Sequence, residues 1–372
     1  MIFCPASAAA AQFRPSPLPE ALVRWGVLRP ADAAAASVSD LSCSHLVRRV
    51  GTPASALVVK FETPDRPGLD RERLVHRLAV HLPPLREVLP PAHLLDERAP
   101  LVLGDLDAVP GDLDAVLGDL GSSGPPGDSR TQDPADAAGV LGTMLAGVHR
   151  STAGLPLPRA IEPSLLLLVR EWCQGLGSHG HRRLVADLAP DTAAVVAAVA
   201  RDRALREAVV ELGDDTAVCL VHHDLTQRNL WFGRVPGSGV LRGYLLDWEL
   251  AGLGDPAVDL GWALADLLLA DGSGVPRPAT RPLSCVSRLL PPSAVALLTA
   301  YRDAAGLRPD AVNTLARRTA LAATVRVAQT GLELSSHHGP PARERTSGLL
   351  REARTLIAEV TGLTEEIAGC LT

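Results

Sequence analysis

Residues 222–249 constrain the fold of this chain more than any other stretch of the sequence. The stretch begins at His222, has an asparagine (Asn229) five residues after Asp224, and ends near a second aspartate, Asp247. One apolar run precedes His222, and two more separate Asn229 from Asp247. These runs predict a strand that enters a short polar loop and a hairpin that leaves it. A loop and hairpin of this length can present two carboxylates and one amide to a single cleft.

That set of side chains is typical of phosphoryl transfer, which needs a carboxylate near the attacking hydroxyl and two oxygen ligands for a metal ion on the phosphates. The spacing from histidine to aspartate to asparagine is short enough to occur by chance. The alternative is therefore an ordinary hairpin whose polar residues cap its turns. We favour phosphoryl transfer because the predicted strands flank the loop on both sides.

Two further segments resemble a known family when they are taken together with residues 222–249. Residues 254–260 read Gly-Asp-Pro-Ala-Val-Asp-Leu, and residues 145–149 read Leu-Ala-Gly-Val-His. The chain thus resembles the aminoglycoside phosphotransferase and choline kinase-like family, relatives of the protein kinases. The resemblance implies that Asp224 is the catalytic aspartate and that His222 braces its loop. It also implies that Asn229 and Asp247 hold magnesium (Mg2+).

The same resemblance implies that Asp259 is a structural carboxylate that ties the catalytic loop to the following helix. A plainer interpretation is that Asp259 and His149 satisfy polar groups in the core or cap a helix. We favour the plainer interpretation for both residues.

Lys60 is the only lysine among the 36 lysine and arginine residues of the chain. It lies in Ala56–Phe61, an apolar run that predicts a strand, and the chain uses arginine everywhere else. A compact ammonium and a planar guanidinium are not equivalent at a phosphate site. The family resemblance places a phosphate-anchoring lysine in such a strand, commonly held by a glutamate of the next helix. Glu72, in a helix expected over residues 70–82, is the candidate partner; a solvated carboxylate at the helix start is the alternative.

Two positions depart from the family pattern. The turn before the lysine strand, within residues 41–50, contains no glycine, whereas kinases usually cover the phosphates with a glycine-rich loop. Ser42, Ser44 and their backbone amides are the candidate phosphate contacts in its place. The second departure is His223, which stands where small-molecule kinases of the family usually carry glycine. Its imidazole either shapes the acceptor pocket or points into the core.

The sequence predicts an α+β, bilobal protein-kinase-like fold, with a small sheet-rich N-lobe and a larger helical C-lobe. We place an N-terminal extension and the N-lobe in residues 1–102. Residues 103–134 are a hinge and a low-complexity acidic insert, in which a seven-residue unit repeats between Gly104 and Gly121. The insert is either an acidic flap or a solvated surface loop, and we favour the loop. Leu103 ends a strand that resembles the hinge where adenine docks.

Residues 135–372 form the predicted C-lobe with the catalytic loop. Apolar positions recur there at helical spacing. The helices are expected over residues 136–150, 162–174, 192–212, 259–270, 293–305, 310–334 and 342–360.

Composition and charge narrow the partners. The net charge of −6 and the lack of a basic run argue against nucleic acid, and no stretch has the roughly twenty apolar residues of a membrane span. The six cysteines show no Cys-x-x-Cys pattern, so they are interpreted as buried thiols in a reducing cytoplasm. We therefore expect a cytoplasmic enzyme that uses ATP and Mg2+.

The acceptor is left open between two enzyme classes. The chain passes almost directly from Asp247 to Asp259, which leaves no room for an activation loop. Residues 247–257 also resemble phosphotransferase-like proteins of thioamitide and class V lanthipeptide pathways. That resemblance implies a kinase for Ser or Thr of a precursor peptide, working with a partner lyase, and we place it ahead of a small-molecule kinase. A catalytically weak module that binds a peptide or partner protein is a third hypothesis.

Overall fold

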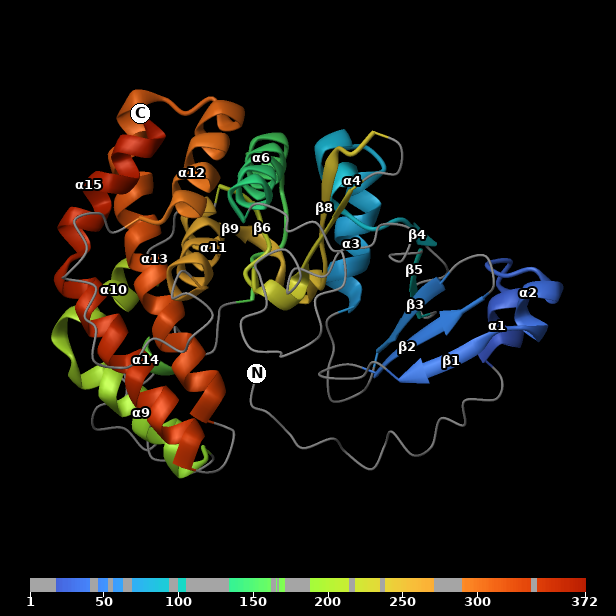
Figure 1. Cartoon of the computed structure of the whole chain (residues 1–372), viewed down its shortest axis with the longest axis horizontal. Helices are drawn as coiled ribbons and strands as arrows, with labels where there is room; N and C mark the ends of the chain where they lie inside the picture. Colours follow the sequence, from blue (N-terminus) through green and yellow to red (C-terminus); the bar gives the residue numbers. More distant parts are fainter. Residues whose placement is uncertain are drawn as a thin grey trace. The chain divides into compact units, whose positions relative to one another are not determined.

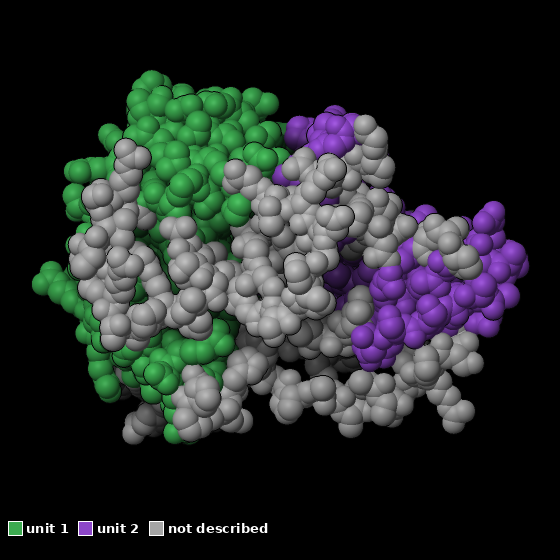
Figure 2. Space-filling view, viewed as in Figure 1, with its two compact units in different colours: residues 1–3, 113–228, 252–372 green, residues 4–112, 229–251 purple. Residues whose placement is uncertain are grey.

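The computed structural model describes residues 18–40, 46–52, 56–62, 69–93, 100–104, 134–161, 165, 167–170, 188–213, 218–234, 238–270, 290–335 and 340–372. These residues belong to two compact units (Figure 2). Unit 1 comprises residues 1–3, 113–228 and 252–372, and unit 2 comprises residues 4–112 and 229–251. The α+β bilobal fold expected from the sequence is confirmed, with an antiparallel sheet in unit 2 and a mostly helical unit 1.

The sheet of unit 2 has five antiparallel strands in the order β1-β2-β3-β5-β4 (Figure 1). The strands are β1 (Ser37–Asp40), β2 (Leu46–Gly51), β3 (Ala56–Phe61), β4 (Ala92–His93) and β5 (Leu101–Leu103). One face packs on α1 (Leu18–Arg24), where Leu22, Val50 and Val59 are fully buried in one cluster. Burial of these apolar side chains on a shared face stabilises the sheet.

The helices of unit 2 differ from the expected pattern. The helix predicted over residues 70–82 ends early, as α3 (Leu69–Ala79), and is followed by the short α4 (Pro83–Val88). Pro83 and Pro84 begin α4 because proline suits the first turn of a helix but not its interior. The short helices α1 and α2 (Pro30–Ala34) were not predicted from the sequence.

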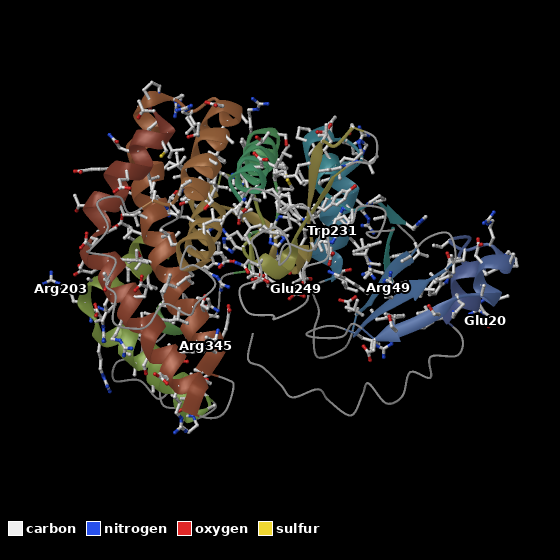
Figure 3. The ribbon with its side chains drawn as sticks, in the orientation of Figure 1. Glu20, Arg49, Arg203, Trp231, Glu249 and Arg345 are labelled. Atoms are coloured by element: carbon white, nitrogen blue, oxygen red, sulfur yellow. The ribbon has the colours of Figure 1, made fainter. Side chains whose placement is uncertain are left out.

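The predicted hairpin is confirmed as β7 (Leu230–Arg234) and β8 (Leu241–Leu245) of unit 2. Its register pairs Leu230 with Leu245 and Trp231 with Tyr244, whose rings stack. A 3-10 turn, η3 (Trp248–Leu250), follows the hairpin and packs against α3. Trp231 and Glu249 are labelled in Figure 3 and mark the hairpin and this turn.

Unit 1 is built around the long helix α13, which packs against α9, α10, α11, α14 and α15 (Figure 1). The helices are α6 (Pro134–Thr152), α9 (Pro190–Arg201), α10 (Arg203–Gly213), α11 (Pro256–Ala270), α12 (Pro292–Ala305), α13 (Pro309–Ser335), α14 (Pro340–Ala358) and α15 (Val360–Leu371). Gly261 lets α11 approach α13 closely, since a Cβ there would meet the backbone nitrogen of Ala323 at 2.7 Å.

Two helix predictions need correction. The helix expected over 192–212 is divided into α9 and α10 at Asp202, whose carboxylate accepts a hydrogen bond from the Leu205 amide at 3.2 Å and so starts a new helix. The helix expected to end at residue 360 ends at Ala358, and α15 follows it directly. Of residues 162–174, only 165 and 167–170 are described, and they are helical.

The strand predicted before the catalytic loop is β6 (Cys219–Val221), which pairs with β9 (Gly252–Gly254) in unit 1. Cys219 is a buried thiol as expected, but Cys370 is partly exposed. No helix in the described residues has the length and apolar character needed to cross a membrane.

Candidate active site

Lys60 of β3 lies between two carboxylates of unit 2. Its Nζ donates to Oε1 and Oε2 of Glu72, both at 2.9 Å, and to Oδ1 of Asp247 at 2.9 Å. Glu72, on α3, is only 1% exposed, so it is not the solvated helix-start carboxylate of the alternative interpretation. The lone lysine and the glutamate of the next helix therefore form a buried ion pair, and Asp247 completes a triad.

The charges of this triad favour a cationic Lys60. Burial alone would lower the pKa of Lys60, but the carboxylates of Glu72 and Asp247 outweigh burial and raise it. Glu249 is also buried and adds a further negative charge near Glu72. One ammonium thus faces an excess of carboxylates, which gives the cluster a net negative charge when all are ionised. Such a cluster attracts a divalent cation.

The hairpin brings Asp247 next to Asn229. The Leu246 amide donates to the Asn229 carbonyl at 2.8 Å, directly beyond the Leu230–Leu245 pair. Asp247 has a left-handed backbone, with φ 65°, and its side chain makes no capping bond to η3. The turn is fixed instead by Trp248, whose indole nitrogen donates to the Leu245 carbonyl at 2.9 Å. This geometry leaves the Asp247 carboxylate directed to Lys60.

The donor set fits magnesium. One carboxylate and one amide are the hard oxygen ligands that Mg2+ takes from proteins, with nucleotide phosphates and water completing the shell. Within the described ranges no three His, Cys, Asp or Glu side chains cluster as a metal site.

The loop at residues 222–228, which is predicted to be catalytic, is held in unit 1 by Asp259 of α11. Asp259 accepts hydrogen bonds from the backbone amides of His222 at 2.8 Å and His223 at 2.9 Å, and His149 lies 3.2 Å away. His222 in turn accepts a bond from the Asp224 amide at its Nδ1, at 3.2 Å. Asp259 therefore ties the loop to α11, as the resemblance implied. It also satisfies buried polar groups, as the plainer interpretation that we favoured allowed, while no contact among the described residues shows it capping its own helix. His149 does satisfy core groups, since its other nitrogen meets the Tyr301 hydroxyl at 3.1 Å.

His223 points into the core. Its Nδ1 lies 3.0 Å from the Ile161 carbonyl, and the residue is 8% exposed. Its φ of 66° is in the left-handed region, which glycine adopts without strain and other residues rarely adopt. The structure thus gives a physical reason for the glycine that the family usually carries here.

We expect His223→Gly and His223→Asn to fold with thermal midpoints within a few degrees of the wild type, and His223→Val to be clearly less stable. Glycine and asparagine tolerate the left-handed backbone, whereas a β-branched residue adds about 1–2 kcal/mol of strain. Calorimetry of the three variants checks this. A valine variant as stable as the glycine variant would show that the backbone at this position relaxes freely.

His76 was not singled out from the sequence. It lies on α3 one turn after Glu72, is 5% exposed, and its Nε2 has no hydrogen-bond partner among the described atoms. Burial, with a smaller contribution from the positive charge of Lys60, lowers the pKa of His76 to about 4. His76 is therefore neutral at neutral pH. A histidine in an otherwise amphipathic helix gives no sequence signal of this burial.

We expect His76 to contribute a loss of stability as the pH falls from about 6.5 to 4. Over that range the unfolded state protonates His76 and the folded state does not, so the unfolded state binds more protons. The loss is about 3 kcal/mol for a pKa that moves from 6.5 to about 4. Urea midpoints at several pH values measure it: His76→Leu should flatten this dependence, and His81→Leu, at an exposed histidine just beyond α3, should not. Equal slopes in both variants would contradict the assignment.

Of the three other residues predicted to contact the nucleotide, the structure describes only Leu103. Ser42 and Ser44 lie outside the described residues; β1 and β2, which flank them, pair in antiparallel register. Leu103 is buried at the end of β5, where it pairs with Val58 of β3. Of the acidic repeat, only Gly104 is described.

The fold, the triad of Lys60, Glu72 and Asp247, and the loop held by Asp259 define a kinase-like phosphotransferase. A comparison with protein families matches residues 42–281 to the phosphotransferase enzyme family. The chain belongs to this family, and the enzyme class expected from the sequence is confirmed. No match was found among the curated proteins.

Solved structures of kinases share the fold at low identity. A choline/ethanolamine kinase family protein from Mesorhizobium loti is 15% identical with a TM-score of 0.55, and 94% of this chain and 98% of that chain are covered. Ethanolamine kinase from Plasmodium vivax is 12% identical with a TM-score of 0.52, covering 89% and 85%. Amicoumacin kinase, solved with AMP-PNP, Ca2+ and Ami, is 14% identical with a TM-score of 0.55, covering 94% and 95%.

Proposed function

We propose that this phosphotransferase moves the γ-phosphate of ATP, bound with Mg2+, to a hydroxyl group of a small molecule. The observation that carries the proposal is the buried triad of Lys60, Glu72 and Asp247. Taking a lysine and two carboxylates out of water carries a large desolvation cost, so a buried triad is weak evidence of a purely stabilising role. Neutralising nucleotide phosphates is the functional role that fits a buried cation here.

The side chains divide the work of the reaction. Lys60, kept cationic by Glu72, binds the phosphates and stabilises the negative charge on them. Asn229 and Asp247 would hold a magnesium ion, which would neutralise charge on the phosphates. Asp224 orients the acceptor hydroxyl and takes its proton, and His222 and Asp259 keep Asp224 in place.

The names of the structural neighbours support a small-molecule acceptor: they are ethanolamine, choline/ethanolamine and amicoumacin kinases. The amicoumacin kinase was solved with a nucleotide analogue and a divalent cation, which supports the use of ATP and a metal ion. The peptide acceptor that we favoured from the sequence has no such support. It remains a prediction, as do the partner lyase and the cytoplasmic location.

Calorimetric titration with ATP, with and without Mg2+, combined with a transfer assay, tests the proposal. We expect Mg2+-dependent binding, and we expect Asp224→Asn to abolish transfer while it leaves nucleotide binding intact. Asp303→Asn, at an exposed carboxylate of α12, is the control and should leave both unchanged. Absence of ATP binding at millimolar nucleotide would favour the binding-module hypothesis instead.

The acceptor is tested by mass spectrometry on two panels. One panel contains amino alcohols, aminoglycosides and macrolides, and the other contains Ser- and Thr-rich peptides. We expect an added phosphate on a small-molecule hydroxyl. Phosphate added only to peptides, and to no small molecule, would favour the peptide-kinase hypothesis instead.

A further inference from the structure

Helix α11 carries a second carboxylate toward the catalytic loop. Asp266 lies seven residues after Asp259, two helical turns further along the same face. Its Oδ2 accepts a hydrogen bond from the Gln227 amide at 3.1 Å. Asp259 holds the loop at 222 and 223, and Asp266 holds it at 227. Asp224 therefore lies within a short segment fixed at both ends by one helix.

Arg326 of α13 lies over Trp262 of α11, one helical turn before Asp266. Arg326 is 4% exposed, and its Nη1 donates to Oε1 of Glu333 at 2.7 Å. Its guanidinium also lies 5.9 Å from the ring centroid of Trp262, on α11. Its positive charge acts on both Asp266 and Asp224. Burial raises the pKa of Asp266 to about 6, and the charge of Arg326 and the Gln227 amide limit that rise.

Gln329 of α13 connects Glu333, the partner of Arg326, to the segment at Leu165. Gln329 donates through Nε2 to Glu333 at 3.1 Å and accepts a bond from the Leu165 amide at 2.8 Å. Polar contacts thus run from the segment at Leu165 through α13 to the charges beside the catalytic loop. Buried networks of this kind specify one arrangement of the elements they join.

We propose that Asp266 and Arg326 are positioning residues of the catalytic loop: Asp266 fixes its end at Gln227, and Arg326 supplies the counter-charge that lets Asp266 and Asp224 stand near each other. The assignment rests on the proposed function in taking Asp224 as the catalytic aspartate. It deepens that function by adding a second support for the loop, independent of Asp259. Neither residue needs to contact nucleotide or acceptor.

Four variants separate positioning from substrate contact. Asp266→Ala removes the acceptor oxygen, and Asp266→Asn keeps an oxygen but loses the charge. Arg326→Met removes the counter-charge, and Arg326→Lys keeps it. We expect kcat to fall roughly 10- to 100-fold in Asp266→Ala and Arg326→Met, because small displacements of a catalytic group are costly. The conservative variants should recover part of this loss, and KM for ATP and acceptor should change by less than about threefold.

Hydrogen–deuterium exchange of the full-length protein gives a readout that does not depend on activity. Asp266→Ala should exchange faster in peptides covering 225–228, while peptides covering 219–223, held by Asp259, stay protected. Asp303→Asn should match the wild type in every measurement.

Two outcomes overturn the assignment. Unchanged kcat together with unchanged exchange in Asp266→Ala would show that the loop does not need this contact. A raised acceptor KM at unchanged kcat would make Asp266 an acceptor contact instead. If the wild type transfers no phosphate, the proposed function fails, but the exchange at 225–228 still decides whether Asp266 fixes the loop.

Discussion

Lys60→Met should lower kcat for phosphoryl transfer about 10²–10³-fold and also destabilise the protein. The methionine leaves Glu72 and Asp247 without their shared cation, and an uncompensated buried charge costs about 3–5 kcal/mol. Loss of one preorganised electrostatic contact on reacting phosphates costs about 10²–10³-fold in kcat. Both effects come from one nitrogen, so the variant alone does not separate them.

A matched double variant separates folding from catalysis. Lys60→Met with Glu72→Gln removes the cation and one of its partner charges together, so the urea midpoint should recover most of its loss. The loss of kcat should remain. Lys60→Arg should fold well but transfer poorly, since the larger planar group does not replace a compact ammonium at 8% exposure. Full activity in Lys60→Arg would contradict the role given to the lone lysine.

The sequence predicted the parts of the site that depend on local chain geometry. The spacing of Asp224, Asn229 and Asp247 predicted a loop and hairpin, and the β7–β8 register delivers Asn229 and Asp247 side by side. The rarity of lysine singled out Lys60, and helical spacing placed Glu72 on the following helix. Such features can be predicted because a strand or a turn determines the position of residues that lie within a few places of it in the sequence.

Contacts between distant segments were not readable in the same way. Asp266 interrupts an apolar run, and Arg326 is a lone charge in an alanine- and valine-rich stretch of α13. Nothing in either run indicates that the two side chains lie close enough to interact. That proximity depends on the approach of α11 to α13 at Gly261. The sequence likewise indicated that position 223 is unusual, but only the backbone angle showed why glycine is common there. Isolated charges within apolar helices single out Asp266 and Arg326 as unusual, but they do not indicate that the two lie together.

Asp259→Ala should be the most destabilising single change in unit 1. The carboxylate is 1% exposed and accepts bonds from two backbone amides and faces His149. Each buried amide left without a partner costs about 1–3 kcal/mol, so the two together cost several kcal/mol. Asp259→Asn should be milder, because one oxygen can still accept a bond while the amide nitrogen opposes the other donor.

The pH dependence of these variants distinguishes lost charge from lost packing. Burial would raise the pKa of Asp259, but the hydrogen bond and charge of His149 and the contacts from His222 outweigh it and hold the pKa below its usual value. A carboxyl with a depressed folded pKa stabilises the protein above its unfolded pKa, and that contribution is lost as the pH falls through the folded value.

The wild type should therefore lose this stability in acid, and Asp259→Asn should lack the step because its side chain does not titrate. Urea midpoints from pH 7 to 3 measure it, with the exposed Asp310→Asn of α13 as control. If Asp259→Asn and the wild type lose the same stability in acid, that loss comes from other carboxylates. Asp259 would then hold the loop through its hydrogen bonds, without a contribution from its charge.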